Sequence, residues 1–407
     1  MLSSMFTAIS ALAAHQNYLN VVSDNLANTN TNGFKASRVL FQDQYSQLIS
    51  SGSSPTATSG GTNPTQIGLG VQTGYISPVF TQGTMQSTGR NLDLAVQGDG
   101  FFIYGSNANQ LYSREGSMSL DSSGNLVNSA TGLNVQGWPA DPITGLVDTT
   151  KPVGNINVTT NQTIAQATTT AGFAGNLDSA TANGVPGIPV GMGVYDSLGN
   201  LQQGTVTFTR TGPNDWDWNV TSPATAAGKG TITFDANGQY SASTGNGTVN
   251  LLGSTGANPV KPVLDLTKMT MLSAATSVTV PSEDGLPAGS VVNINVAQNT
   301  GVVSLVYSNG MNQTVGQVAL ARFTNPDGLQ RTGNTMFKVG LNSGNPQIGA
   351  AGVDGRGMLS AGYLEASNVD LAQEMTNMIL AERGFEANSK VITTSDQILQ
   401  ALVNLKQ

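Results

Sequence analysis

Cysteine is absent from the chain, histidine occurs once, and charged residues are scarce. Without Cys there is no disulfide framework, thiolate metal site or cysteine nucleophile. The lone His15 cannot build a multi-histidine metal site, and a packing or surface role is expected for it. Only 10% of residues are charged and the net charge is −8. This balance argues against binding nucleic acid or an anionic membrane through counterion release.

Long apolar runs and an early basic segment are also missing. No apolar run in the sequence reaches the length that crosses a bilayer. The N-terminal stretch is apolar like the centre of a secretory signal, yet no Lys or Arg precedes Lys35. The basic region of such a signal is therefore lacking. If the protein leaves the cytoplasm, we expect a route that retains this terminus.

The composition that remains indicates a β-rich protein. The 407 residues suffice for two or three domains, and 49 glycines with abundant Asn, Thr and Ser favour many turns and short strands. From about Gly70 to Tyr363, segments such as "LDLAV", "TVTFTR" and "VVNINV" alternate or run apolar over strand lengths. No Gly-rich strand-to-helix pattern occurs, so a doubly wound nucleotide-binding fold is not expected.

Both ends carry apolar residues at a spacing of three to four, which predicts helices. Ser367 followed by Asp370 is the expected N-cap of the second helix. Either each helix packs on its own domain, or the two helices pair and bury the remaining apolar face against other copies. The stripes, candidates for a polymerisation interface, comprise Leu2, Met5, Ile9, Leu12, Leu19 and Leu26 at the start and Leu371, Met375, Met378, Phe385, Ile392, Leu399 and Val403 at the end.

Polar residues interrupt the second stripe at one heptad position, namely Glu382, Ser389 and Asp396. A polar residue repeated at one position weakens a seam but fixes its register and partner. Residues 50–66 ("SSGSSPTATSGGTNPTQ") have the composition of a flexible linker. Such a linker would keep the first helix from docking on a nearby core, which favours the paired interpretation.

Three "D-x-x-G" segments could be mistaken for calcium-binding loops: "DSSGNL", "DSLGNL" and "DANGQY". A calcium loop of the EF-hand type needs an acidic residue at its twelfth position. That position holds Gly132, Thr207 and Asn246 in the three segments. Hairpin turns are therefore expected at all three.

One pair of carboxylates could act as an acid–base pair. Asp215 and Asp217 lie two residues apart, so both face one side of a strand. Nothing nearby in the sequence would perturb their pKa values. An exposed strand face with Trp216 and Trp218 turned inward is the expected arrangement, and no enzyme activity, metal or cofactor is predicted.

Three blocks of sequence together resemble the bacterial flagellar rod and hook axial proteins. They are "SDNLANTNTNGFK" (23–35), "QSTGRNLDLAVQGDGFF" with "YSREGSMSLDSSGNLV" (86–102 and 112–127), and the segment 362–405 that begins "GYLEASNVDLAQEM". Each block is moderately specific, and all three in this order are highly specific. The residues that match the family motif are Asn25, Asn28, Gly33, Phe34, Gly89, Arg90, Asp93, Gly98, Gly100, Phe101, Ser367, Asn368 and Asp370.

This resemblance implies a mostly β fold in which one β-rich domain is inserted in another, on a coiled-coil-like pair of terminal α-helices. The insertion is similar to the outer domain of hook proteins at "GMGVYDSLGNLQQGTVTFTRTGPNDWDWNV". The expected domains are a helical polymerisation domain (1–35 and 366–407), a linker (36–70), an inner β-domain (71–144 and 279–365) and an inserted outer β-domain (145–278).

The resemblance also implies a structural function. The expected role is a subunit that self-polymerises into the hook, the flexible coupling that carries torque from rod to filament. Expected partners are further copies, the rod, hook cap and hook–filament junction proteins, and the flagellar type III export apparatus, without nucleic acid or membrane insertion. The expected location is extracellular, on the flagellum, after export without a cleaved signal peptide. In such a tube, Glu382, Ser389 and Asp396 either set register or face the water-filled channel.

Two alternatives stay open. The segment between Phe41 and Gly70 looks longer than in many hook proteins and is similar to an insertion of the distal rod protein, so a rod or junction subunit is one alternative. A secreted carbohydrate-binding β-protein that stacks sugars on Trp138, Trp216 and Trp218 is the other. For the asparagines before Lys35, we expect turn or left-handed conformations that lead the chain out of the helix, with Gly33 supplying a positive φ.

Overall fold

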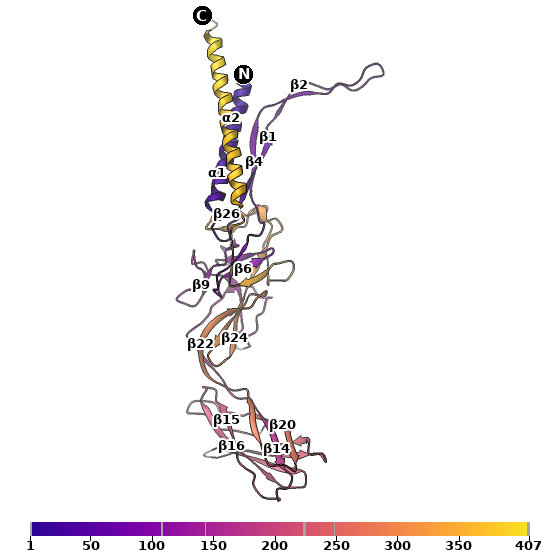
Figure 1. The fold of residues 1–407 in the computed structure, drawn as a ribbon, viewed down its shortest axis with the longest axis vertical. Coiled ribbons are helices and arrows are strands. Elements are labelled where there is room, and N and C mark those ends of the chain that lie inside the picture. The colour runs from indigo at the N-terminus through magenta and orange to yellow at the C-terminus, as the bar shows by residue number, and fades with distance from the viewer. Residues whose placement is uncertain (1, 107–108, 143, 223–224, 248, 405–407) are drawn as a thin grey trace. The chain divides into compact units, whose positions relative to one another are not determined.

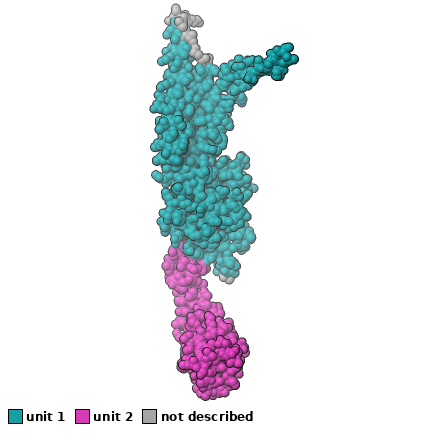
Figure 2. Space-filling view, turned by 45° about the vertical axis from the view of Figure 1, so that its right-hand side comes forward, with its two compact units in different colours: residues 1–158, 295–304, 314–407 teal, residues 159–294, 305–313 magenta. Residues whose placement is uncertain are grey.

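The computed structural model describes residues 2–106, 109–142, 144–222, 225–247 and 249–404. They form two compact units, coloured separately in Figure 2. Unit 1 comprises Met1–Val158, Asn295–Ser304 and Thr314–Gln407, and unit 2 comprises Thr159–Ile294 and Leu305–Gln313. Unit 1 is thus interrupted in sequence by unit 2. The predicted fold class, β-rich units with an insertion and helices at both ends, is confirmed.

The terminal helices are α1 (Leu2–Ala27) and α2 (Leu371–Asn404), which lie side by side (Figure 1). Both helices lie within the ranges 1–35 and 366–407 expected for the helical domain. The N-cap of α2 is Asp370, whose Oδ1 accepts the backbone N–H groups of Ala372 (2.9 Å) and Gln373 (3.1 Å). The proposed capping role of Ser367 is wrong, because its Oγ instead accepts the N–H of Val369 before the helix begins.

The predicted linker at 36–70 is largely a β-ribbon, which corrects the sequence interpretation. Antiparallel pairing joins β1 to β4 and β2 to β3, and a further bridge joins Ser53 to Thr62. The β1–β4 part of the ribbon lies along α1 (Figure 1): Ser10 Oγ accepts the N–H of Val71 (3.3 Å), and Asn17 donates to Thr73 Oγ1 (3.4 Å). The strands are β1 (Ser37–Asp43), β2 (Ser46–Ser50), β3 (Thr65–Gly68) and β4 (Val71–Pro78).

The β-part of unit 1 is built on a sheet in the order β26-β27-β8-β7-β25-β28. Its core is aromatic, with Phe101 between Phe323 and Phe337 at centroid distances of 5.8 and 6.1 Å. A short 3₁₀ helix, η1 (Pro326–Gly328), precedes β26. The strands are β7 (Phe101–Tyr104), β8 (Leu111–Ser113), β25 (Leu320–Arg322), β26 (Gln330–Gly333), β27 (Met336–Lys338) and β28 (Gln347–Gly349).

Further antiparallel pairs complete unit 1: β5 with β30, β6 with β29, β9 with β10, and β11 with both β12 and β24. The β5–β30 and β6–β29 pairs join the segment that follows the ribbon to the segment that precedes α2. Their bounds are β5 (Met85–Ser87), β6 (Leu94–Gln97), β9 (Met118–Leu120), β10 (Leu126–Asn128), β11 (Gln136–Pro139), β12 (Gly154–Asn155), β24 (Asn312–Val318), β29 (Met358–Ala361) and β30 (Tyr363–Glu365).

Unit 2 contains two sheets that share one apolar core. One has the order β15-β16-β17-β18-β19, and the other the order β20-β14-β21 with β14 and β20 parallel. Trp216 and Trp218 alternate inward along β17 and are buried, while Asp215 and Asp217 point outward. The strands are β14 (Thr170–Asp178), β15 (Val190–Tyr195), β16 (Leu201–Arg210), β17 (Asp215–Ser222), β18 (Thr225–Phe234), β19 (Tyr240–Ser243), β20 (Val263–Leu272) and β21 (Thr279–Glu283).

The chain first passes from unit 1 to unit 2 between Val158 and Thr159, outside the strands, and its three later crossings lie within strands. In unit 2, β13 (Thr163–Gln166) pairs with β22 (Leu286–Val296). The later crossings lie in β22, β23 (Val302–Tyr307) and β24. The observed boundaries therefore differ from the predicted insertion at 145–278. Residues 145–158 belong to unit 1, where Trp138 donates its indole N–H to Lys151 O (2.7 Å), and residues 279–294 belong to unit 2.

The three "D-x-x-G" segments are hairpin turns, as predicted. In each, one carboxylate oxygen accepts the backbone N–H groups two and four residues further on, and the glycine has a φ between +72° and +82°. They connect β9 to β10, β15 to β16 and β18 to β19. The first residues are Asp121, Asp196 and Asp235.

Candidate functional site

The two terminal helices approach each other through small side chains. A Cβ atom at Gly384 would lie 2.5 to 3.0 Å from three atoms of the His15 ring. The ring of His15 also contacts that of Phe41 in the ribbon, at a centroid distance of 5.8 Å. The packing role predicted for His15 is thus observed. Small or polar residues are buried along both helices, namely Ala8, Ala11, Ala14, Asn25, Ala381 and Ser395.

Much of the apolar surface of the helices remains exposed. Phe6 on α1 and Leu380 on α2 are 63% and 61% exposed. Of the predicted stripe, Met5, Leu12, Leu19, Leu26, Met378, Ile392 and Leu399 are half-buried, while Ile9, Leu371, Met375, Phe385 and Val403 are exposed. Sequence periodicity missed Phe6, Ile379, Leu380, Val391 and Ile398, because they lie beside the stripe rather than on it.

The three polar heptad positions lie differently along α2. Glu382 and Asp396 are exposed and Ser389 is half-buried. Asp396 accepts a hydrogen bond from Gln400 of the same helix (2.9 Å). A role for all three in the register of the α1–α2 pair therefore lacks support within one chain, because the exposed positions do not face α1.

Below the helices, the motif "GFK" and the segment before α2 meet at a buried ion cluster. Lys35 Nζ lies 2.6 Å from Glu365 Oε1, and both side chains are fully buried. Nζ also donates to Thr81 O (2.7 Å). Arg114 Nη1 lies 3.5 Å from the other carboxylate oxygen of Glu365. Burial lowers the pKa of Lys35, an effect that Glu365 opposes and Arg114 reinforces.

Two asparagines of the motif fasten this junction through their side chains. Asn25, buried near the end of α1, exchanges two hydrogen bonds of 2.8 Å with the backbone of Ser37. Asn368 accepts the N–H of Ala36 (2.8 Å) and donates to Val79 O (2.8 Å). These amides replace backbone partners that the chain loses where it leaves a helix or strand.

The predicted turns are confirmed, because Asn28, Asn30 and Asn32 lie in turns after α1. The predicted left-handed conformations are wrong. Among the described residues, the non-glycine positions with positive φ do not include any asparagine between residues 20 and 35. Asn28 instead donates to Asp24 O (2.9 Å) and accepts from Thr31 Oγ1 (3.1 Å). Gly33 does have φ +71°, as predicted, but it lies beyond the helix end, and a Cβ there would meet the backbone of Glu115 at 2.5 Å.

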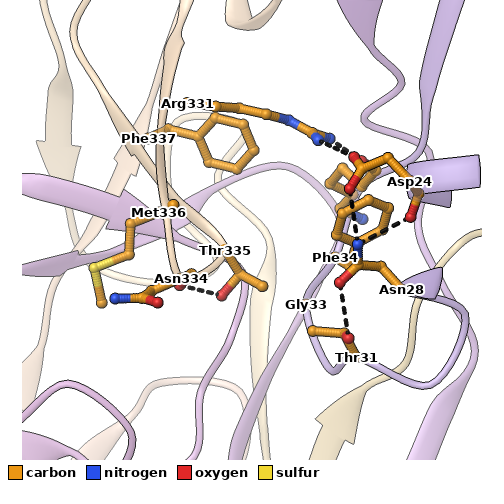
Figure 3. Close-up of a pocket in the computed structure, with 12 residues that line it drawn as sticks. Asp24, Asn28, Thr31, Gly33, Phe34, Arg331, Asn334, Thr335, Met336 and Phe337 are labelled. Atoms are coloured by element: carbon orange, nitrogen blue, oxygen red, sulfur yellow. Dashed lines mark hydrogen bonds and ion pairs between the residues drawn. The ribbon is translucent and has the colours of Figure 1, made fainter. Parts of the chain in front are cut away.

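A cavity of about 480 Å³ opens beside this turn, between the end of α1 and the β26–β27 hairpin (Figure 3). Arg331 lies over the Phe34 ring, with Cζ 5.0 Å from its centroid, and pairs with Asp24 at 3.7 Å. Arg331 also donates to Lys35 O. Burial lowers the pKa of Arg331, and Asp24 opposes that shift.

The remaining motif residues lie in the β-part of unit 1. Gly89, Gly98 and Gly100 have φ of +70°, +103° and +140°. Asp93 is buried, and its Oδ1 lies 3.6 Å from Arg90 Nη1. Phe101 belongs to the aromatic core described above. These positions shape the backbone and the core, and they do not converge on one chemical centre.

The junction is completed by four residues that no sequence pattern had indicated, namely Glu365, Arg114, Thr81 and Arg331. Lys35 is the first cation of the chain, and a lone cation next to an apolar "GF" pair hints at burial. No local pattern identifies its carboxylate partner 330 positions away.

The alternative of a carbohydrate-binding protein loses support. Trp138, Trp216 and Trp218 are 2%, 1% and 0% exposed, so none offers a sugar-stacking platform. Across the described residues, no group of three or more His, Asp or Glu side chains is placed to hold a metal ion. None of the described helices combines the length and apolar character needed to span a membrane.

Comparison with known proteins agrees with this arrangement. Four family models match in chain order: "Flagella basal body rod protein" at 5–35, "Flagellar hook protein FlgE/F/G D1 domain" at 95–171, "Flagellar basal body protein FlaE D2 domain" at 189–286, and "Flagellar basal body rod FlgEFG protein C-terminal" at 360–405. The first and last contain the two halves of the junction around Lys35 and Glu365.

Similar proteins cover the full length of the chain. The flagellar hook protein FlgE of Borreliella burgdorferi is 38% identical over 100% of both chains. That of Salmonella typhimurium is 35% identical over 99% of this chain and 100% of the relative. The crystal structure of Helicobacter pylori flagellar hook protein FlgE2 covers 69% of this chain and 100% of its own, with a TM-score of 0.50 and 15% identity, which supports the fold. By its sequence over its whole length, the chain belongs to the flagellar hook protein FlgE family.

Proposed function

We propose that this structural protein polymerises into the hook through the exposed apolar faces of α1 and α2. The observation that carries the proposal is the exposure of large apolar residues along both helices, including Phe6, Ile379, Leu380 and Val403. Helices with such faces are stabilised when further copies cover them, because covering removes apolar surface from water. A heterologous contact of this kind that does not close into a ring produces an open helical tube.

Within each subunit, the junction and the outer β-surfaces have different mechanical roles. The buried junction around Lys35 and Glu365 ties both helices to the β-part of unit 1. Force on the helices then passes through hydrogen bonds and ion pairs instead of a flexible linker. Outer β-surfaces rich in Thr and Asn make polar, hydrated contacts that can shift in register while the tube bends.

The proposal includes the setting in which the subunit acts. Its partners are further copies, the rod, hook cap and junction proteins, and the flagellar type III export apparatus. Export retains the N-terminus, since α1 carries the exposed faces used in assembly. The role is structural, without catalysis or a cofactor.

A rod subunit is the second candidate. The flagellar basal-body rod protein FlgG of Bacillus subtilis is 31% identical over 100% of both chains. Deleting the gene distinguishes the two: flagella that stop as complete rods without hooks favour the hook subunit, and incomplete rods favour the rod subunit.

Leu380→Asp tests the assembly face. A carboxylate in an apolar contact costs several kcal/mol per copy, so tubes should disappear in electron micrographs while the monomer keeps its circular dichroism spectrum. Gln397→Asp is the matched control, because it adds the same charge at an exposed position seven residues from Lys390, on the charged face of α2 and away from Leu380. Normal tubes from the Leu380 variant contradict the proposal.

A further inference from the structure

The buried cluster at the junction contains more positive than negative charge. Lys35 and Arg114 both face Glu365, and their side chains are 0%, 3% and 0% exposed. One carboxylate therefore serves two buried cations. A buried charge without a counter-charge is unfavourable, so this cluster would be stabilised by one more negative group.

Arg114 has unused hydrogen-bonding capacity. Its Nη1 lies 3.4 Å from Val96 O and 3.5 Å from Glu365 Oε2, which are long contacts. Its Cζ lies 5.2 Å from the centroid of the Phe101 ring. The Nε–H is buried and has no hydrogen-bond partner among the described residues. Arginine normally uses its planar fork to hold an oxyanion through two parallel bonds.

Arg114 lines a cavity of about 180 Å³ in unit 1, together with a second arginine, Arg322. The aromatic side chains of Phe80 and Phe101 line the same cavity. Arg322 is half-buried, and its hydrogen bond among the described residues is a long one, to Asp354 O at 3.4 Å. The cavity therefore combines two guanidinium groups with apolar walls.

A single acidic residue, Asp99, also lines this cavity. Its side chain is exposed, and among the ion pairs of the described residues none joins it to Arg114 or Arg322. Its charge nevertheless reaches Arg114, where it opposes the lowering of the Arg114 pKa by burial. The two arginines and this one carboxylate together give the cavity wall one net positive charge. That balance suits a monoanion and disfavours a dianion such as phosphate, which Asp99 would repel.

We propose that this cavity is an oxyanion site that binds one carboxylate group between Arg114 and Arg322. The carboxylate comes from an acidic side chain of a second copy or from a free carboxylate ion. Its oxygens accept hydrogen bonds from the Arg114 Nε–H and from the Arg322 guanidinium. Binding supplies the counter-charge that the Lys35–Glu365–Arg114 cluster lacks. The site is separate from the helix faces proposed for assembly.

Titration of the full-length monomer with acetate at constant ionic strength tests the site. With ¹⁵N-labelled arginine, the Nε–H resonance of Arg114 should shift and saturate. Arg322→Gln should weaken the apparent Kd about tenfold, the loss of one charge-assisted contact. Arg322→Lys, which keeps the charge but not the fork, should fall between. Arg383→Gln removes an equal charge on α2, outside the cavity, and should leave the titration unchanged.

The assembled form identifies the source of the carboxylate. A shifted Arg114 resonance in tubes without acetate indicates a side chain from a second copy, and a shift only on adding acetate indicates a free ion. Phosphate should bind more weakly than acetate. An Arg114 resonance that does not saturate with acetate in the monomer, or an equal response in the Arg322→Gln variant, overturns the proposal. Because the monomer arm does not require polymerisation, its result is independent of the assembly test with Leu380→Asp.

Discussion

Lys35 Nζ and Glu365 Oε1 lie 2.6 Å apart although the residues are 330 positions apart in the chain. The same segments share a backbone bond, from the N–H of Gly33 to Glu365 O at 2.7 Å. Glu365 Oε1 also accepts the N–H of Gly83 at 2.9 Å. One carboxylate therefore joins the chain that leaves α1, the chain that enters α2 and the segment after the ribbon.

Removing the carboxylate should destabilise the junction more than removing the lysine. Glu365→Gln leaves two buried cations without a counter-charge, whereas Lys35→Met leaves Arg114 and Glu365 as a pair. Breaking a buried pair costs about 3 kcal/mol or more, equivalent to roughly a hundredfold faster amide exchange. Hydrogen exchange of peptides from 33–37 and β30 measures both variants.

Peptides from β17 in unit 2 provide the internal reference, and Lys338→Met, at an exposed position in β27, is the control substitution. A Lys35→Met variant that exchanges faster than Glu365→Gln would show that the junction does not depend on this carboxylate.

The terminal helices, the β-rich middle and the three acidic turns could be predicted because each depends on a local pattern. Helix periodicity and the Asp-x-x-Gly frame are contained within a few residues. The outer part of the ribbon escaped prediction because β2 and β3 are exposed on both faces and lack the apolar alternation of a half-buried strand. The ion cluster escaped because ion pairing across 330 positions leaves no periodic trace.

Gly384→Ala should weaken the α1–α2 pair although alanine favours helix formation by about 1 kcal/mol. The new methyl group would lie 2.5 Å from the His15 ring, which Phe41 confines on another side. We expect loss of hydrogen-exchange protection in both helices. The double variant His15→Ala with Gly384→Ala should recover protection, because it removes the obstructing ring. Equal protection in the wild type and Gly384→Ala would mean that the helices are not held at this contact.

Acid should destabilise unit 2 through Asp196. Burial opposes ionisation of Asp196, but hydrogen bonds from Ser254, Asn200 and Leu198 outweigh it and lower the pKa well below the usual range. A carboxyl group with a lowered folded-state pKa contributes stability above its unfolded pKa of about 3.9. That contribution is lost as the pH falls from about 4 towards the folded-state pKa.

Asp196→Asn should therefore remove about 2 kcal/mol of stability at neutral pH and flatten the acid dependence. Fluorescence of Trp216 and Trp218 in a Trp138→Phe background reports unfolding of unit 2. Asp235→Asn is the matched control, since Asp235 has the same turn frame and two backbone donors. Identical acid transitions in the Asp196 and Asp235 variants would rule out a special contribution from Asp196.

Ser389→Leu separates the two proposals for the polar positions of α2. Glu382 and Asp396 are exposed and Ser389 is half-buried, which favours the channel-facing role over a register role. We therefore expect tubes of normal length and shape by electron microscopy, with at most slower export of later subunits. Ser395→Leu is the contrasting variant: Ser395 is only 7% exposed, so a larger side chain there should disturb helix packing by about 1 to 3 kcal/mol. Altered tubes from Ser389→Leu, with a helix signal equal to that of the wild type, would instead support the register role.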